Sequence, residues 1–216
     1  AMAGYQTAAM DSVGKVATLD FDGPAAINNN FTGVGSIGFP IEVVVASTWN
    51  KGLAQAWGEC MGKISQEMGA EGWYAPGMNT HRTAFGARNY EYFSEDAVLT
   101  AGQGAAIIKA GHEYGVLIAP KHLAFNDTEI NRTGIAEFMT EQAARENELR
   151  GTQSCIEDAN ALAVMTTYNR VGCVTSNAHT GLLLNIVRKE WGFKGLMSED
   201  FIQDPTYTKI RMAVHN

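Results

Sequence analysis

The amino-acid sequence predicts an α/β protein, an incomplete (β/α)8 TIM-type barrel of about six βα units. Short apolar, β-branched runs alternate with longer segments of helical period along the chain. Polar residues come directly after several of the predicted strands, and in a barrel these positions converge on one mouth. An open doubly wound sheet, the alternative, would spread the same residues along its edge. The sequence therefore favours the barrel.

Six apolar runs are the predicted strands. They are Val16–Phe21, Ile41–Ala46, Gly72–Ala75, Val116–Ala119, Leu162–Thr166 and Gly195–Ser198. Because a closed barrel of this type has eight strands, residues 1–216 are expected to form a single, partial barrel domain.

Apolar residues at helical spacing predict the helices that cover these strands. The predicted helices are Asn50–Met68, Glu95–Tyr114, Thr180–Glu190 and Gln203–Asn216, with two more, broken near Gly151, inside Thr133–Asn160. The segment Ser94-Glu95-Asp96 has the composition of a helix N-terminus.

Composition restricts the class of partner. The net charge is −7 and no run of Lys or Arg is present, which argues against nucleic acid and anionic membranes. No stretch of 18 apolar residues and no basic-then-apolar leader occurs, so we expect no membrane association and a cytoplasmic location. A neutral small molecule is the partner that fits.

No metal and no cofactor is expected. The three cysteines are far apart and form no CxxC pair, so neither a zinc site nor a disulfide framework is indicated. The glycine-rich segment at residues 33–38 lacks the following helix that a phosphate-binding loop requires. This argues against a nucleotide or PLP enzyme built on the same barrel.

Candidate site residues stand at the ends of the predicted strands. They are Asp22, Asn79 with His81 and Arg82, Lys121 with His122, Tyr168 with Asn169, and Asp200. A charged lysine straight after an apolar strand is costly unless it faces a polar cavity, which favours a site at Lys121. Glu199 and Asp200 are adjacent at the end of the last strand, where alternation would let only one face the mouth.

Six motifs, taken in order, resemble the N-terminal barrel of the family 3 β-glucosidases. The family patterns are D-G-P, A-P-G-x-N-x-H-R, G-R-N-x-E-Y-F-S-E-D, K-H-F-x-x-N-D-x-E-x-x-R, M-T-x-Y-N-R and W-G-F-x-G-x-x-x-S-D. This chain has them at Asp22–Pro24, Ala75–Arg82, Arg88–Asp96, Lys121–Arg132, Met165–Arg170 and Trp191–Asp200. The resemblance runs from about Thr18 to Phe201.

The resemblance implies a retaining β-glycosidase that removes a terminal β-linked sugar from a small β-glucoside or oligosaccharide. The family's nucleophilic aspartate matches Asp200. The residues that match the family's subsite for the nonreducing sugar are Asp22, Arg88, Lys121, His122, Arg132 and Tyr168. Carboxylate, lysine and arginine groups of this kind can hold sugar hydroxyls through charge-assisted hydrogen bonds.

The chain also departs from the family pattern. Leu123 replaces the phenylalanine of K-H-F, and Ala87 replaces the glycine before Arg88. Glu199 stands where Ser or Thr is usual, and a second buried charge there would raise the pKa of Asp200.

No general acid is evident. Retaining glycosidases need a second carboxyl group about 5–5.5 Å from the nucleophile. Most of the family takes it from a following domain, and a subgroup takes it from a G-H-G-D loop that residues 121–127 do not match. The alternative function is therefore a catalytically weak or inactive truncated fragment that binds sugar or only self-assembles.

A partial barrel is expected to leave strand edges and apolar faces uncovered, at Val43, Val45, Leu117 and Val164 among others. Either the chain termini fold across the gap or two copies pair, and a homodimer is favoured. In such a dimer, Glu91 or Glu129 of one copy could enter the other copy's site as a substitute acid.

Overall fold

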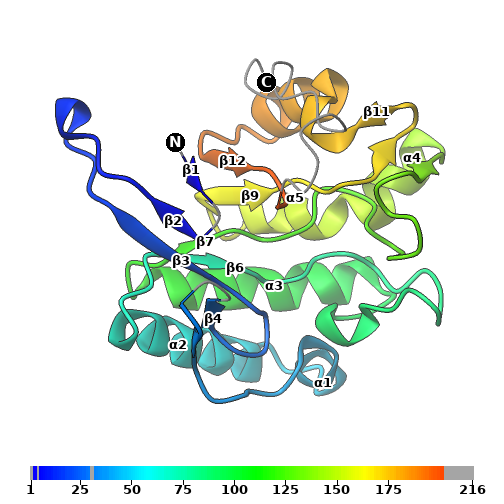
Figure 1. Cartoon of the computed structure of the whole chain (residues 1–216). Coiled ribbons are helices and arrows are strands. Elements are labelled where there is room, and N and C mark those ends of the chain that lie inside the picture. The colour runs from blue at the N-terminus through cyan, green and yellow to red at the C-terminus, as the bar shows by residue number, and fades with distance from the viewer. Residues whose placement is uncertain (1, 4, 30–31, 202–216) are drawn as a thin grey trace.

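The computed structural model describes residues 2–3, 5–29 and 32–201, which form an α/β fold (Figure 1). The strands are β1 (Met2–Ala3), β2 (Gln6–Thr7), β3 (Thr18–Asp22), β4 (Asn28–Asn29), β5 (Val34–Gly35), β6 (Gly72–Tyr74), β7 (Leu117–Ile118), β8 (Ala136–Glu137), β9 (Ala163–Met165), β10 (Arg170–Val171), β11 (Val174–Thr175) and β12 (Leu196–Ser198). The α-helices are α1 (Glu42–Ser47), α2 (Lys51–Glu67), α3 (Ala97–His112), α4 (Glu141–Ala143) and α5 (Arg150–Glu157). Short 3₁₀ turns lie at Asp11–Val13, Asn89–Glu91 and Ser176–Ala178, and π-helices lie at Ala144–Glu148 and Gly181–Glu190.

Five of these strands run parallel, in the order β3-β6-β7-β9-β12. β3 pairs with β6, β6 with β7, and β9 with β12. The chain after β7 joins the two groups, because Leu123 N donates to Met165 O at 2.8 Å and Met165 N donates to Pro120 O at 3.0 Å. Sequential parallel neighbours with covering helices are the arrangement of a (β/α) barrel, so the predicted α/β class of TIM-barrel type is confirmed.

Five of the six predicted strands are found within two residues of their expected ends, but the strand predicted at Ile41–Ala46 is wrong. That segment is helix α1. Its β-branched run suggested a strand, yet Glu42, Val45 and Ala46 are buried while Val44 is exposed, which is helical spacing. The Glu42 carboxylate accepts a hydrogen bond from Gly77 N at 2.8 Å, and this tertiary contact fixes the helix against the core.

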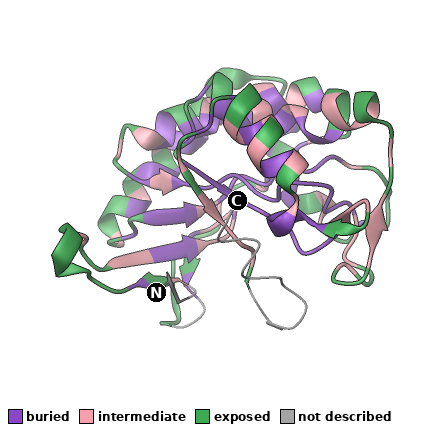
Figure 2. Ribbon diagram, turned by 90° about the horizontal axis from the view of Figure 1, so that it is seen from above, coloured by how far each residue is buried: buried purple, intermediate pink, exposed green. Residues whose placement is uncertain are grey.

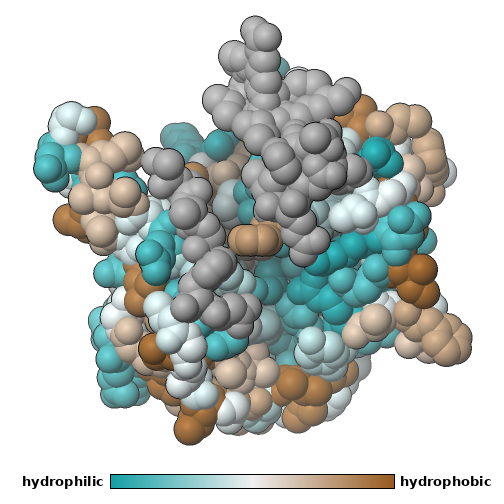
Figure 3. Space-filling view, in the orientation of Figure 1, coloured by the Kyte–Doolittle hydropathy of each residue, from teal (hydrophilic) through white to brown (hydrophobic). Residues whose placement is uncertain are grey.

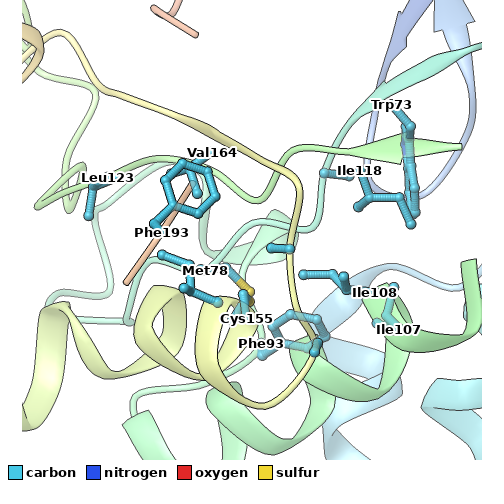
Figure 4. Packing of buried hydrophobic residues seen from close by; sticks show 14 of the residues in the cluster. Trp73, Met78, Phe93, Ile107, Ile108, Ile118, Leu123, Cys155, Val164 and Phe193 are labelled. Carbon is cyan, nitrogen blue, oxygen red and sulfur yellow. The ribbon is translucent and has the colours of Figure 1, made fainter. Parts of the chain in front are cut away.

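Helices α2, α3 and α5 pack in series along one side of the strands (Figure 1). Asn50 caps α2 by accepting from Gly52 N and Leu53 N, and Asp96 caps α3 in the same manner. The core between helices and strands contains Trp73, Met78, Phe93, Ile107, Ile108, Cys155, Val164 and Phe193 (Figure 4). Figure 2 shows that burial is concentrated on the strands and on the helix faces turned toward them.

The helical segment is divided at Leu149, two residues before the break predicted near Gly151. Helical residues run from Glu141 to Glu148 and from Arg150 to Glu157 on either side of it. Gly151 is small for a packing reason: a Cβ there would lie 3.1 Å from Met78. The helix predicted at Gln203–Asn216 lies outside the described residues.

The two edges of the parallel sheet differ. The hairpin β1–β2 pairs antiparallel with β3, with Gln6 opposite Leu19, and covers that edge. Among the described residues, β12 pairs with β9 alone, so its outer edge is unpaired there. The expectation of uncovered apolar faces is wrong for Val45 and Val164, which are buried in the core, whereas Leu117 is half-buried.

Candidate functional site

A cavity of about 510 Å³ lies at the carboxyl ends of the parallel strands. It is lined by Tyr5, Asp22, Tyr74, Arg88, Lys121, His122, Glu129, Arg132, Met165, Tyr168, Glu199, Asp200 and Phe201. Figure 3 shows a hollow with hydrophilic walls on this side of the molecule. The seven residues that match the family's nucleophile and sugar subsite therefore lie around one pocket, whose size is in the ~300–1,000 Å³ range of small-ligand sites.

A series of side chains with alternating negative and positive charge begins at Asp22. Its Oδ1 lies 2.6 Å from Lys121 Nζ, and the same ammonium lies 3.1 Å from Glu91 Oε1. Arg88 then grips Glu91 with two hydrogen bonds, Nε to Oε2 at 2.8 Å and Nη2 to Oε1 at 2.7 Å. This bidentate geometry fixes the direction of the guanidinium as well as its charge.

The alternation continues from Arg88 to Asp200. Arg88 Nη1 lies 3.4 Å from Glu129 Oε1, and Arg132 Nε lies 3.1 Å from Glu129 Oε2. Arg132 Nη1 in turn lies 3.8 Å from Asp200 Oδ2, and its guanidinium stacks 4.5 Å above the ring of Tyr168. Each buried charge thus has a neighbour of opposite sign, which is the condition for keeping such charges out of water.

Lys121 is held in its charged form. Burial by itself would lower its pKa, but the carboxylates of Asp22 and Glu91 raise the pKa above the ordinary lysine value. In the same way, burial would raise the pKa of Asp22, but Lys121 and the Gly23 N–H hold it below the usual range. At neutral pH the pair is therefore an ammonium facing a carboxylate.

His122 is neutral at pH 7. Burial, followed by the positive charges of Arg88 and Lys121, lowers its pKa well below the ordinary value. The Asn79 side chain forms two hydrogen bonds with the His122 backbone: Nδ2 donates to the carbonyl oxygen, and Oδ1 accepts from the N–H. This orientation places Oδ1, an acceptor, 3.1 Å from His122 Nδ1. The proton must then sit on Nδ1, which leaves Nε2 as an acceptor directed toward Asp200 at 3.9 Å.

Asp200 and Glu199 both border the pocket, so the expectation that only one of them could do so is wrong. Strand β12 ends at Ser198, and the alternation of strand side chains no longer applies beyond it. Glu199 is held by Asn177 Nδ2 at 3.0 Å, whereas Asp200 lies beside His122 and Arg132. Burial raises the pKa of Asp200, and Arg132 lowers it; burial is the principal cause, rather than the adjacent Glu199.

Four polar residues predicted beside strand ends do not line the pocket, and one of them, Asn169, donates from Nδ2 to the backbone oxygen of Ala124 at 3.2 Å. Asn79 supports His122 from behind, and His81 Nε2 lies 2.9 Å from the backbone oxygen of Tyr92. Arg82 instead pairs with Glu148 at 3.0 Å.

Sequence reasoning missed several residues that line the pocket or pair with the residues lining it. Glu91 and Glu129 stand inside the quoted motifs G-R-N-x-E and N-D-x-E, so their motif positions were an available signal. They were instead considered as acids for a second copy, but both form ion pairs within their own chain, and Glu91 is only 6% exposed. No sequence signal marked Tyr5, which reaches the pocket from the N-terminal hairpin.

Residues 25–209 match the N-terminal domain of glycosyl hydrolase family 3. The chain belongs to this family. It is 33% identical over 181 residues to Beta-glucosidase A of Butyrivibrio fibrisolvens, covering 83% of this chain and 22% of the relative. It is 37% identical over 169 residues to Beta-glucosidase B of Emericella nidulans, covering 78% of this chain and 20% of the relative. The resemblance drawn from the six motifs is confirmed.

Solved structures agree with this assignment. Beta-glucosidase 3B from Thermotoga neapolitana in complex with glucose matches with a TM-score of 0.85 at 33% identity, over 91% of this chain and 28% of that one. The Kluyveromyces marxianus beta-glucosidase in complex with glucose matches with a TM-score of 0.89 at 30% identity, over 93% and 25%. The chain thus spans less than a third of the length of each of these proteins.

Two further observations concern the described residues alone. None of their helices is long and apolar enough to cross a membrane. Within the same residues, no group of three or more His, Cys, Asp or Glu side chains is arranged to hold a metal ion.

Proposed function

We propose that this chain is part of a retaining β-glycosidase of β-glucosidase type, and that residues 1–216 are one partial barrel domain of it. The observation that carries the proposal is the convergence of Asp22, Arg88, Lys121, His122, Arg132, Tyr168 and Asp200 on one cavity. The names of the relatives support a β-linked glucoside as the substrate class.

The proposed first step is attack by the Asp200 carboxylate on the anomeric carbon. The bond from that carbon to the aglycone oxygen breaks, and the leaving oxygen takes a proton from an acid. Asp22 and the Nε2 of His122 accept hydrogen bonds from the sugar hydroxyls, while Lys121 and Arg88 donate to them. Ion pairing fixes Asp22, Lys121 and Arg88 before the substrate arrives, and Asn79 fixes His122, which is how an enzyme keeps its reorganisation cost low.

In the second step, water attacks the anomeric carbon and releases Asp200, and a base takes the proton of the water. We propose that this acid and base is one carboxyl group supplied from outside the chain, because Asp22 and Glu129 are already ion-paired and Glu199 is tied to Asn177. Without it, hydrolysis should be slowed ~10²- to 10⁴-fold for substrates with poor leaving groups.

Hydrolysis of 4-nitrophenyl β-D-glucoside tests the proposal, because 4-nitrophenolate leaves without a proton. We expect slow release that Asp200→Asn abolishes and that Asp11→Asn, a change at an exposed carboxylate, leaves intact. Glucose binding without any release would favour the alternative of a sugar-binding fragment. If the chain neither binds glucose nor releases 4-nitrophenolate, the β-glucosidase assignment is refuted.

A further inference from the structure

Tyr5 enters the pocket from outside the segment that matches the family. The family match begins at residue 25, and the hairpin β1–β2 precedes it. Antiparallel pairing of β2 with β3 and a hydrogen bond from Asp20 N to Tyr5 O at 2.9 Å anchor the residue beside the site. Its φ of 61° lies in the left-handed region, which a bulky side chain rarely adopts, and the pairing of β2 with β3 holds the backbone there.

The phenol of Tyr5 contacts a residue of the proposed sugar site. Its hydroxyl donates to Asp22 Oδ2 at 3.0 Å, while the other oxygen, Oδ1, accepts from Lys121 and from Gly23 N at 2.7 Å. Hydrogen bonds to both oxygens therefore fix the orientation of the Asp22 carboxylate. Oδ2 retains one lone pair for a ligand hydroxyl, because each carboxylate oxygen can accept two hydrogen bonds.

The ring of Tyr5 also forms part of the pocket wall. Its centroid lies 5.7 Å from that of Tyr74 with the planes tilted by 49°, and both side chains line the cavity. Tyr74 is itself fixed by a hydrogen bond from its hydroxyl to Asp20 at 2.8 Å. Sugar rings have an apolar face, and an aromatic wall beside hydrogen-bonding carboxylates suits them.

From these contacts we infer that Tyr5 is a positioning residue of the sugar site, which orients Asp22 through its hydroxyl and closes one side of the pocket with its ring. The inference rests on the proposed function. It assigns to the N-terminal hairpin, a segment outside the family match, a part in holding the β-glucoside.

Calorimetric titration with D-glucose tests the inference on the full chain. Tyr5→Phe keeps the ring and should weaken binding roughly 3- to 10-fold, as expected for one lost hydrogen bond. Tyr5→Ala, which also removes the wall, should weaken it further, while Tyr90→Phe, at an exposed tyrosine, should leave it unchanged. Unchanged or tighter glucose binding in both Tyr5 variants overturns the inference, since tighter binding would make Tyr5 an obstacle to the sugar.

A second measurement separates this inference from the proposed function. The Tyr5 hydrogen bond helps to hold down the pKa of Asp22, so a carbon-13 titration of that carboxyl should show a higher pKa in Tyr5→Phe. If the wild-type chain binds no glucose, the proposed function fails. If the Asp22 titration is the same in both proteins, the positioning contact fails, whatever the glucose result.

Discussion

Lys121 Nζ lies 2.6 Å from Asp22 Oδ1, although the two residues are 99 positions apart in the chain. The contact ties the end of β7 to the end of β3, and Lys121 is almost fully buried. Because Glu91 contacts the same ammonium, one lysine neutralises two carboxylates, of which Asp22 lines the pocket and Glu91 lies behind it.

Replacing Lys121 should therefore damage both stability and binding. Lys121→Met leaves Asp22 and Glu91 facing each other without their shared cation, and removing one partner of a buried pair costs roughly 3–5 kcal/mol. Urea unfolding should show this loss, and glucose affinity should fall in parallel. Arg145→Met, which breaks an exposed ion pair with Glu190, is the control and should cost less than about 1 kcal/mol. An equal cost for both variants would contradict the prediction.

Activated substrates should leave the chain as a covalent glycosyl intermediate. With a nucleophile but no acid or base, attack on an activated glucosyl fluoride should form an ester at Asp200, and its hydrolysis should stall. Intact-protein mass spectrometry should show a glycosyl adduct in the wild-type chain and none in Asp200→Asn. An adduct that persists in Asp200→Asn would assign the nucleophile to another residue, and Glu199→Gln is the variant to examine next.

A second buried cluster should make stability depend on pH. Burial, reinforced by the neighbouring Glu148, raises the pKa of Asp127 to about 8. Because the folded-state pKa lies above the unfolded value, the stabilising contribution is complete below about pH 4 and is lost as pH rises toward 8. Melting temperatures should fall across this window, at roughly 2–4 °C for each kcal/mol lost.

Asp127→Asn identifies the group responsible. The amide cannot ionise, so the fall in melting temperature between pH 5 and pH 8 should be smaller in the variant than in the wild type; Glu42, whose pKa is raised by burial, keeps part of the dependence. Arg82, Glu137 and Glu148 face the same carboxyl and remain in place. A pH dependence as steep as that of the wild type would show that Asp127 is not its source.

The sequence was most informative where a residue's role is local. Strand ends followed by polar residues gave the pocket, since parallel strands bring their carboxyl ends together whatever the loops between them do. The strand wrongly predicted at Ile41–Ala46 shows the limit: β-branched composition cannot reveal that the Glu42 carboxylate would find the Gly77 N–H. Contacts between distant segments decide such cases.

The missed residues have two different causes. Glu91 and Glu129 each stand three residues from an arginine of the same motif, so their pairing with Arg88 and Arg132 could have been predicted from the sequence. Tyr5 lies in a short hairpin with no recognised motif, and only the pairing of β2 with β3 brings it to Asp22. Site residues that stand inside or beside a motif can be predicted from the sequence, whereas side chains that reach the site through strand pairing cannot.

The chain should form a homodimer through the uncovered side of its sheet. Within the described residues, the outer edge of β12 is unpaired, and Leu196 of β12 also lines a mainly apolar cavity of about 280 Å³ that extends across the sheet to Leu117 and Thr18. Leu196 is 40% exposed, and an apolar edge of this kind favours pairing with a second copy. Light scattering at micromolar concentration should therefore give about twice the 23.3 kDa of one chain.

A charge on that face should separate the two copies. Leu196→Lys would place an ammonium in the apolar contact and should yield monomers, whereas Phe85→Lys, at an exposed residue on another loop, should leave the dimer intact. In the part of the chain that the structure describes, the N-terminal hairpin covers the β3 edge and the β12 edge of the parallel strands is unpaired. A single unpaired edge allows two copies to pair but does not allow longer assemblies. A wild-type protein that is a 23.3 kDa monomer with a cooperative melt would refute the dimer, and would mean that the uncovered side is tolerated in water.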